Sequence, residues 1–137
     1  MATLVEATLM ESVQAIVPLI RAHAGEAERA GYLSPETVEA MRKAKVFRMF
    51  VPKSLGGLEV DPITCTRVVE AVAGVDSVAG WALSNPLSYS FWCSRLPDEG
   101  STEIFGNNPD AIIAGPFHPP LRAMAVDGGY LASGVNS

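Results

Sequence analysis

DPITCTRVVEAVAGVDSVAGWALSNPLSYSFWC, residues 61–93, contains two helix-start signals in succession. Asp61 precedes Pro62, and Asp76 precedes Ser77. A side-chain oxygen at the cap accepts from the free N–H groups of a first turn, and a proline in that turn has no N–H to leave unpaired. The stretch therefore predicts two consecutive helices and places the first part of the chain in the helical class.

The two predicted helices differ in their apolar pattern. The first has one buried stripe, formed by Cys65, Val68, Val69 and Val72. The second, uncharged from 77 to 94, is apolar almost all round, which is typical of a helix surrounded by protein. Its serines, Asn85 and Pro86 argue against a membrane span, and Pro86 should bend it.

The chain upstream of this stretch predicts a long amphipathic helix. Apolar residues there recur every three or four positions, which places them on one face: Leu9, Val13, Ile16, Val17, Ile20, Ala24 and Ala27. Pro18 lies inside this pattern and cannot donate a helical hydrogen bond. The helix is therefore expected either to kink at Pro18 or to begin near Val17.

Between these helices the sequence predicts one more helix and a buried connection. Ser34 and Pro35 are a start signal for a helix that runs to about Lys45. The apolar segment that follows, closed by Pro52, is expected to be extended or irregular and buried: Phe47, Met49, Phe50 and Val51. Residues 53–57 end in paired glycines and predict a turn.

Beyond residue 97 the pattern changes from helix to strand. A short helix from Pro97 to Gly106 is expected, followed by three short apolar runs at 111–114, 124–126 and 130–132 that predict strands. Asp127-Gly128-Gly129 indicates a hairpin turn between the last two. Three short strands do not form a stable covered sheet, so we expect a mainly α protein with an incomplete β region.

Composition narrows the class of protein. The chain has 137 residues, is 48% apolar and carries a net charge of −5, which suits a globular fold and disfavours nucleic acid as a partner. Cys65 and Cys93 lie far apart and form no metal-binding spacing. Glu6 and Glu11 interrupt the region where an export signal would lie. A cytoplasmic protein with no membrane partner and no metal is the expectation.

Direct motifs for catalysis are missing. The sequence contains no GxGxxG, no GxxxxGK[ST] and no GxSxG, and no acid–base pair can be nominated, so no catalytic residue is assigned. His23, alone on the first helix, is typical of a surface or capping residue. His118 lies in a proline-rich stretch, which indicates either a docking site or a blunted edge strand.

Taken together, the order of the segments resembles the acyl-CoA dehydrogenase superfamily. The likeness is carried by four stretches of the sequence: 51–57 with its VP and GG, 76–81 with its DS and GW, 114–119 with its AG and final P, and 126–134 with VDGGY and SG. This resemblance implies a flavoprotein oxidoreductase that contains FAD. It also implies a helical N-terminal domain, expected at 1–110, and the first strands of a truncated middle β domain, expected at 111–137.

The resemblance also implies roles for some residues. Dehydrogenases of the family, which oxidise acyl-CoA, usually carry Thr-Glu-Pro on the first strand, where this chain has Phe117-His118-Pro119. This feature, with Gly80-Trp81, is more similar to the monooxygenase branch, which hydroxylates aromatic or ring compounds with reduced flavin. That branch often has His-Asn where this chain has Tyr89-Ser90.

By position, Phe117 and His118 are candidate flavin neighbours. The candidate lining of a pocket for a small-molecule substrate is Trp81, Ser84 and Tyr89, although core packing remains an alternative for the aromatic side chains of this helix. Members of the family are commonly homotetramers, so a homo-oligomer is expected. The base and much of the flavin surface are expected beyond residue 137, so the chain alone should not turn over substrate.

One alternative of another class stays open at this point. The chain could be a non-catalytic helical interaction module or partner subunit, in which the strands after Asp110 pair with another subunit or with a second copy of the chain.

Overall fold

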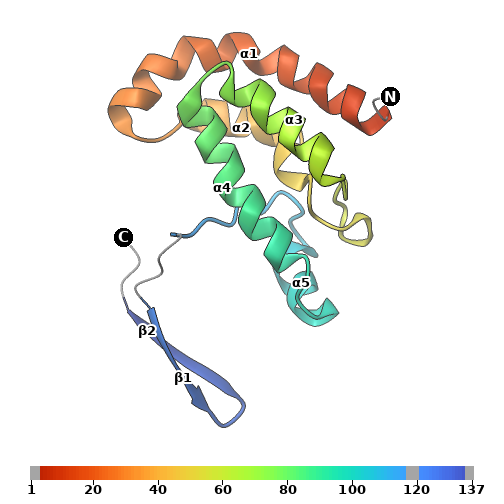
Figure 1. Cartoon of the computed structure of the whole chain (residues 1–137), viewed down its shortest axis with the longest axis vertical. Coiled ribbons are helices and arrows are strands. Elements are labelled where there is room, and N and C mark those ends of the chain that lie inside the picture. Colours follow the sequence, from red (N-terminus) through yellow and green to blue (C-terminus); the bar gives the residue numbers. More distant parts are fainter. Residues whose placement is uncertain (1–3, 117–120, 135–137) are drawn as a thin grey trace.

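The computed structural model describes residues 4–116 and 121–134 of the chain. Within them it contains five α-helices, two short 3-10 helices and one β-hairpin (Figure 1). In chain order these are α1 Leu4–Ala30, α2 Pro35–Lys43, η1 Val46–Arg48, η2 Lys53–Leu55, α3 Pro62–Ala73, α4 Ser77–Cys93, α5 Asp98–Phe105, β1 Leu121–Val126 and β2 Gly129–Gly134. The mainly α fold class is confirmed.

Helix α1 begins well before Val17, one of the two starting points that the sequence left open. It runs from Leu4 to Ala30 and continues through Pro18, so the expectation of a start near Val17 is wrong. Apolar side chains before and after the proline are buried in one core, Leu9, Val13, Val17 and Ile20 among them. Tertiary packing of this continuous stripe stabilises the helix on both sides of the missing hydrogen bond.

The caps that the sequence predicts are present. Ser34 Oγ accepts from the Thr37 N–H at 3.2 Å, and His23 Nδ1 lies 2.7 Å from the same Ser34 Oγ. Asp61 caps α3, and Asp76 caps α4 by accepting from the Ala79 N–H at 2.7 Å. His23 thus supports a helix cap, as its isolated position indicated.

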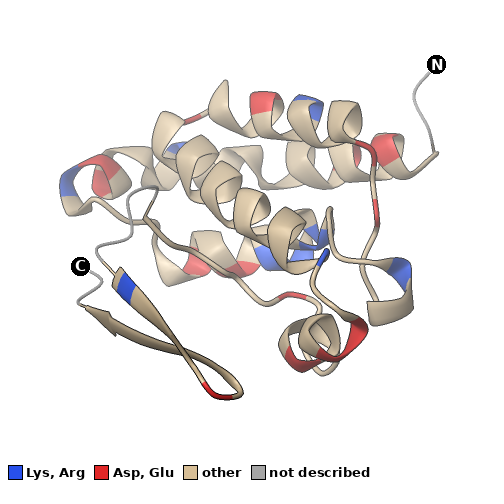
Figure 2. Cartoon of the chain, turned by 60° about the horizontal axis from the view of Figure 1, so that its bottom comes forward, with Lys and Arg blue, Asp and Glu red and all other residues tan. Residues whose placement is uncertain are grey.

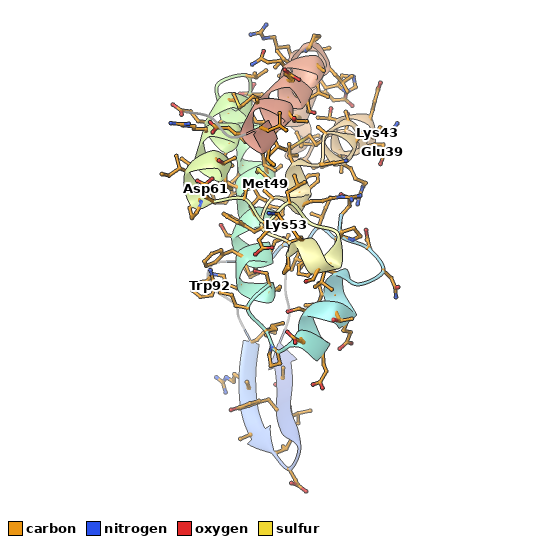
Figure 3. The ribbon with its side chains drawn as sticks, turned by 90° about the vertical axis from the view of Figure 1, so that its right-hand side faces the viewer. Glu39, Lys43, Met49, Lys53, Asp61 and Trp92 are labelled. Carbon is orange, nitrogen blue, oxygen red and sulfur yellow. The ribbon has the colours of Figure 1, made fainter. Side chains whose placement is uncertain are left out.

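The core lies where α1, α3 and α4 meet the connection around η1. It includes Val13, Met41, Val46, Met49, Val68, Val72, Ala79 and Leu83. Figure 3 shows the labelled Met49 inside this packing, and its side chain is fully buried. A Cβ on Gly80 would lie 2.5 Å from Ala73 Cβ, so α3 and α4 approach closely at this glycine. In the segment after α2, Phe47, Met49 and Val51 are buried as expected, whereas Phe50 is half-buried. The segment begins with the short helix η1.

Helix α4 is only half covered by the described residues. Leu83 and Leu87 are buried, but Trp81 is 60% exposed and Trp92 is 67% exposed. Figure 3 shows the Trp92 side chain pointing outward from the helix. The expectation of a helix surrounded on all sides is therefore wrong for this chain, because no other described element covers the second apolar face of α4.

The β region is smaller than the sequence predicts. Residues 111–116 form no strand, because no described strand lies beside them to complete a ladder, so the strand expected at 111–114 is wrong. The other two runs form an antiparallel hairpin in which Val126 pairs with Gly129 and Leu121 with Gly134. Gly128 has φ 81°, which explains the glycine in this turn.

The hairpin projects from the helical part at the end away from α1 (Figure 1). All residues of both strands are exposed, including Tyr130 at 77%. Charged residues lie on α1, α2, α3 and α5, whereas α4 carries none (Figure 2). The hairpin carries one basic residue in β1 and one acidic residue at its turn, Arg122 and Asp127. Its strands are therefore exposed and weakly charged, and within residues 4–116 and 121–134 no further strand pairs with either outer edge.

Among the residues placed in the structure, no helix combines the length and the apolar character that crossing a bilayer requires.

Candidate functional site

The three residues predicted to line a pocket all lie on α4. Trp81 is largely exposed, and Ser84 and Tyr89 are half-buried. Ser84 Oγ donates to the Trp81 carbonyl at 3.2 Å, so this hydroxyl is engaged within its own helix. The structure therefore groups the three residues on one element but gives them different surroundings.

Tyr89 contacts the segment that leads away from the helical part. Its hydroxyl donates to the Pro116 carbonyl at 2.8 Å. One turn earlier, Asn85 Nδ2 donates to the Gly115 carbonyl at 3.2 Å. Side chains four positions apart share one face of a helix, which is why both reach neighbouring carbonyls. Residues 115 and 116 are thereby held along α4.

Gly115 permits this close approach. A Cβ at this position would lie 2.9 Å from Tyr89 Cζ and 3.0 Å from its hydroxyl oxygen, which is too close for a normal contact. The tyrosine ring therefore packs directly against the backbone of the glycine. With any larger residue at 115, either the Tyr89 ring or the segment itself would have to shift.

The same segment is fixed at its start by two arginines. Arg48 binds both carboxylate oxygens of Asp110 through Nε and Nη2, and Arg42 Nη1 donates to the Asp110 carbonyl at 2.7 Å. The hydrogen bond to Asp110 raises the pKa of the Arg48 guanidinium, which stays charged. We call residues 110–116 the tether. It is held at one end by Arg42 and Arg48 and at the other by Asn85 and Tyr89.

Two crevices on the surface of the helical part are lined partly by apolar side chains. One, of about 280 Å³, is lined by residues from the start of α1, the end of α2 and Leu58. The other, of about 230 Å³, lies between the 50–62 connection and the end of α4. In it the rings of Phe50 and Phe91 pack edge to face, with their centroids 5.3 Å apart. The Arg95 guanidinium lies 4.2 Å from the Phe91 ring centroid. Neither crevice is lined by Trp81, Ser84 or Tyr89.

Phe117 and His118, the predicted flavin neighbours, lie outside the described residues. Asn85 was missed as a site residue by sequence reasoning. Its signal was an amide within an apolar helix, four positions before a tyrosine. Such spacing is meaningful only when a neighbouring backbone is known to pass the same helical face.

The two cysteine thiols of the described part are less easily ionised than a free thiol. Burial, aided by the Asp61 charge, raises the pKa of the Cys65 thiol to about 11, and burial also raises that of Cys93. Both thiols therefore stay protonated near neutral pH. Over the described ranges, no three His, Cys, Asp or Glu side chains come together in a way that could hold a metal ion.

A family model and several known proteins are similar to this chain, and they point to the same family. Residues 6–96 match the acyl-CoA dehydrogenase N-terminal domain family. The chain is 37% identical over 114 residues to the indole-3-acetate monooxygenase of Pseudomonas putida. The aligned region covers 83% of this chain and 29% of that protein. It is 25% identical to the oxygenase subunit HsaA of a Rhodococcus jostii flavin-dependent monooxygenase, over 92% of this chain and 33% of that protein.

Solved structures give the same result. The HsaA monooxygenase from M. tuberculosis matches with a TM-score of 0.88 and 26% identity over 94% of this chain and 34% of that chain. XiaF from Streptomyces sp., solved with FADH2 and glycerol, matches with a TM-score of 0.87 and 29% identity over 94% of this chain and 33% of that chain. The chain thus spans about a third of the length of the relatives it matches.

The match covers the capped helices 61–93 that fixed the helical class and the VP and GG of 51–57, so the resemblance seen in the sequence is confirmed. The relatives named above include monooxygenases, one of them named as flavin-dependent, and a protein solved with FADH2. On this match the chain belongs to the acyl-CoA dehydrogenase N-terminal domain family.

Proposed function

We propose that this chain contributes the helical N-terminal domain, residues 1–110, and the start of a middle β domain, residues 111–137, to a flavin-dependent monooxygenase. The observation that carries the proposal is the 37% identity to an indole-3-acetate monooxygenase over 83% of the chain. The relatives named as flavin-dependent oxygenase subunits or hydroxylases support the same class. The proposed reaction inserts one oxygen atom into an aromatic or related ring compound.

The side chains of α4 suit such a reaction. Trp81 offers an exposed indole face, and flat rings bind well against aromatic side chains. We propose Phe117 and His118 as flavin neighbours and Trp81 and Ser84 as pocket lining, with FAD as the flavin. Bound reduced flavin would supply the electrons for oxygen activation. The tether, held by Asn85 and Tyr89, leads directly into residues 117 and 118.

Acyl-CoA dehydrogenation is the less favoured chemistry for this chain. The dehydrogenases usually carry Thr-Glu-Pro where Phe117-His118-Pro119 stands here. The relatives reported above carry the names of monooxygenases rather than dehydrogenases. We further propose a cytoplasmic homo-oligomer, as is common in the family.

The proposal is tested with the protein expressed from the complete reading frame that carries this chain. The purified protein is titrated anaerobically with reduced FAD and, separately, with reduced FMN, and binding is followed by fluorescence. Turnover is then assayed with a flavin reductase and NADH in the presence of indole-3-acetate or p-hydroxyphenylacetate. We expect tight binding of reduced FAD and a product that is heavier by one oxygen atom.

A Trp81→Ala variant separates a flavin or ring contact from a general role in folding. In the 137-residue chain, where Trp81 is 60% exposed, we expect the variant to melt like the wild type. In the protein from the complete reading frame we expect it to lose most of the hydroxylation. The matched control is Trp92→Ala, which removes the same side chain from a position 67% exposed at the far end of α4. Failure of the wild-type protein to bind either reduced flavin would refute the monooxygenase assignment.

A second candidate function rests on the exposed hairpin. Both outer edges of β1 and β2 lack a strand partner among the described residues, and such edges add strands from other chains. The chain could therefore act as an interaction module. Size-exclusion chromatography with light scattering on residues 1–137 tests this candidate. A monomer at all concentrations, unchanged when Leu131→Lys is introduced into β2, would remove it.

A further inference from the structure

The tether is an irregular segment whose position depends on side chains. Residues 111–116 have no regular secondary structure, and among them the Ala111 N–H donates back to the Asn108 carbonyl at 3.0 Å. The carbonyls of Gly115 and Pro116 accept instead from Asn85 and Tyr89. Backbone N–H and C=O groups that are not paired with a neighbouring strand need other hydrogen-bond partners where water is partly excluded.

We infer that Asn85 and Tyr89 are positioning residues that fix the end of the tether on α4. Two hydrogen bonds to consecutive carbonyls define the distance of the backbone from the helix and also its rotation, whereas one bond would leave the segment free to pivot. The contact of the Tyr89 ring with Gly115 adds a steric limit on the side facing α4. The consequence for flavin binding rests on the proposed function, whereas the positioning itself does not.

This assignment changes the role predicted for Tyr89. Its single O–H donor is engaged by the Pro116 carbonyl at 2.8 Å, so the hydroxyl is not available to donate to a substrate. Trp81, on the same helix, is 60% exposed in this chain. Tyr89 therefore acts through the backbone of the tether rather than as a hydrogen-bond donor to a substrate.

The pair of bonds should affect position much more than stability. The tether residues are half-buried or exposed, so little apolar area depends on their docking. Arg42 and Arg48 hold the start of the tether independently, which keeps it near the helical part when the other end is released. A loss of positioning can therefore be measured in a folded protein.

Nuclear magnetic resonance on the 137-residue chain tests the positioning directly. The variants are Tyr89→Phe, Asn85→Ala and their combination, and Ser88→Ala is the control because its hydroxyl donates only within α4, to the Ser84 carbonyl at 3.0 Å. We expect the carbonyl carbon shift of Pro116 to move in Tyr89→Phe and that of Gly115 to move in Asn85→Ala. The heteronuclear NOE of the Gly115 amide should fall in the double variant.

The double variant also provides the outcome that would overturn the inference. A Gly115 NOE and carbonyl shifts equal to those of the wild type, in a double variant with wild-type α4 resonances, would show that other contacts position the tether. Ser88→Ala should leave all these signals unchanged. A change there equal to that in Tyr89→Phe would likewise count against a specific role for Asn85 and Tyr89.

The effect of Tyr89 on flavin binding is measured with the protein expressed from the complete reading frame. We expect Tyr89→Phe to weaken binding of reduced FAD about fivefold, the value of one hydrogen bond, with a melting temperature equal to that of the wild type. A fall in melting temperature in proportion to the loss of affinity would mark a purely structural role and overturn the inference. If the wild-type protein binds no flavin, the proposed function fails, and the resonance measurements decide the positioning alone.

Discussion

Arg48 binds Asp110 with both donors of one guanidinium edge, across 62 positions of sequence. Arg48 belongs to η1, in the connection after α2, and Asp110 begins the tether. The pair therefore joins the middle of the helical part to the point where the chain leaves it. Bidentate pairs of this kind fix geometry as well as charge.

We expect Asp110→Asn to destabilise the protein by about 1–2 kcal/mol. The side chains of Arg48 and Asp110 are 26% and 14% exposed, so the charge interaction is only partly screened by water. Urea unfolding followed by circular dichroism measures the change. Asp127→Asn, the same substitution in the exposed hairpin turn, is the control and should change stability by less than about 0.5 kcal/mol. Equal effects of the two substitutions would contradict the role given to the pair.

Gly80→Ala should destabilise the crossing of α3 and α4 by about 1–3 kcal/mol. The added methyl would lie 2.5 Å from Ala73 Cβ and 2.7 Å from its Cα, so the helices must separate. Thermal melting provides the measurement. Gly25→Ala, in α1 where a Cβ meets nothing within 4 Å, should instead stabilise by about 0.5–1 kcal/mol, since alanine favours helix. The same sign of change in both variants would refute the close-packing argument.

Stability should fall in acid partly through Asp61. Hydrogen bonds, first of all from the Thr64 hydroxyl, lower the pKa of this carboxyl below its ordinary value of 3.8. A lowered folded-state pKa contributes stability that is present above the unfolded value and is lost as pH falls through the folded one. Urea midpoints measured from about pH 5 to about pH 3 should therefore fall less steeply in Asp61→Asn, which keeps a good cap but cannot titrate. Identical slopes would exclude Asp61 as a contributor.

The thiol of Cys65 should resist alkylation in the folded protein. Its pKa is raised to about 11, mainly by burial, so little thiolate forms at about pH 8. Cys93 is half-buried and should react first with iodoacetamide, while Cys65 should react only on unfolding. Intact-mass spectrometry with and without urea follows both sites. Reaction of Cys65 at the same rate in both conditions would contradict its burial.

Local signals in the sequence predicted most helices well. Ser34, Asp61 and Asp76 cap helices because each hydrogen bond is made to a backbone group within three residues. The turn at Gly128 was predictable for the same reason, since positive φ is a property of one residue. The apolar run at 111–114 misled the prediction because a strand forms only when a neighbour completes its ladder. Trp92 misled it too, because hydrophobicity does not reveal whether a partner covers a helix face.

By itself the sequence determined the helical class, the caps and the family, since these depend on contacts between near neighbours or on the order of short motifs. Only the tertiary structure decided that Arg48 meets Asp110 and that Asn85 and Tyr89 hold the carbonyls of Gly115 and Pro116. The physical reason is distance along the chain. A hydrogen bond between residues 27 or 62 positions apart exists only after the core has packed, and no local pattern encodes which backbone will pass a given helix face.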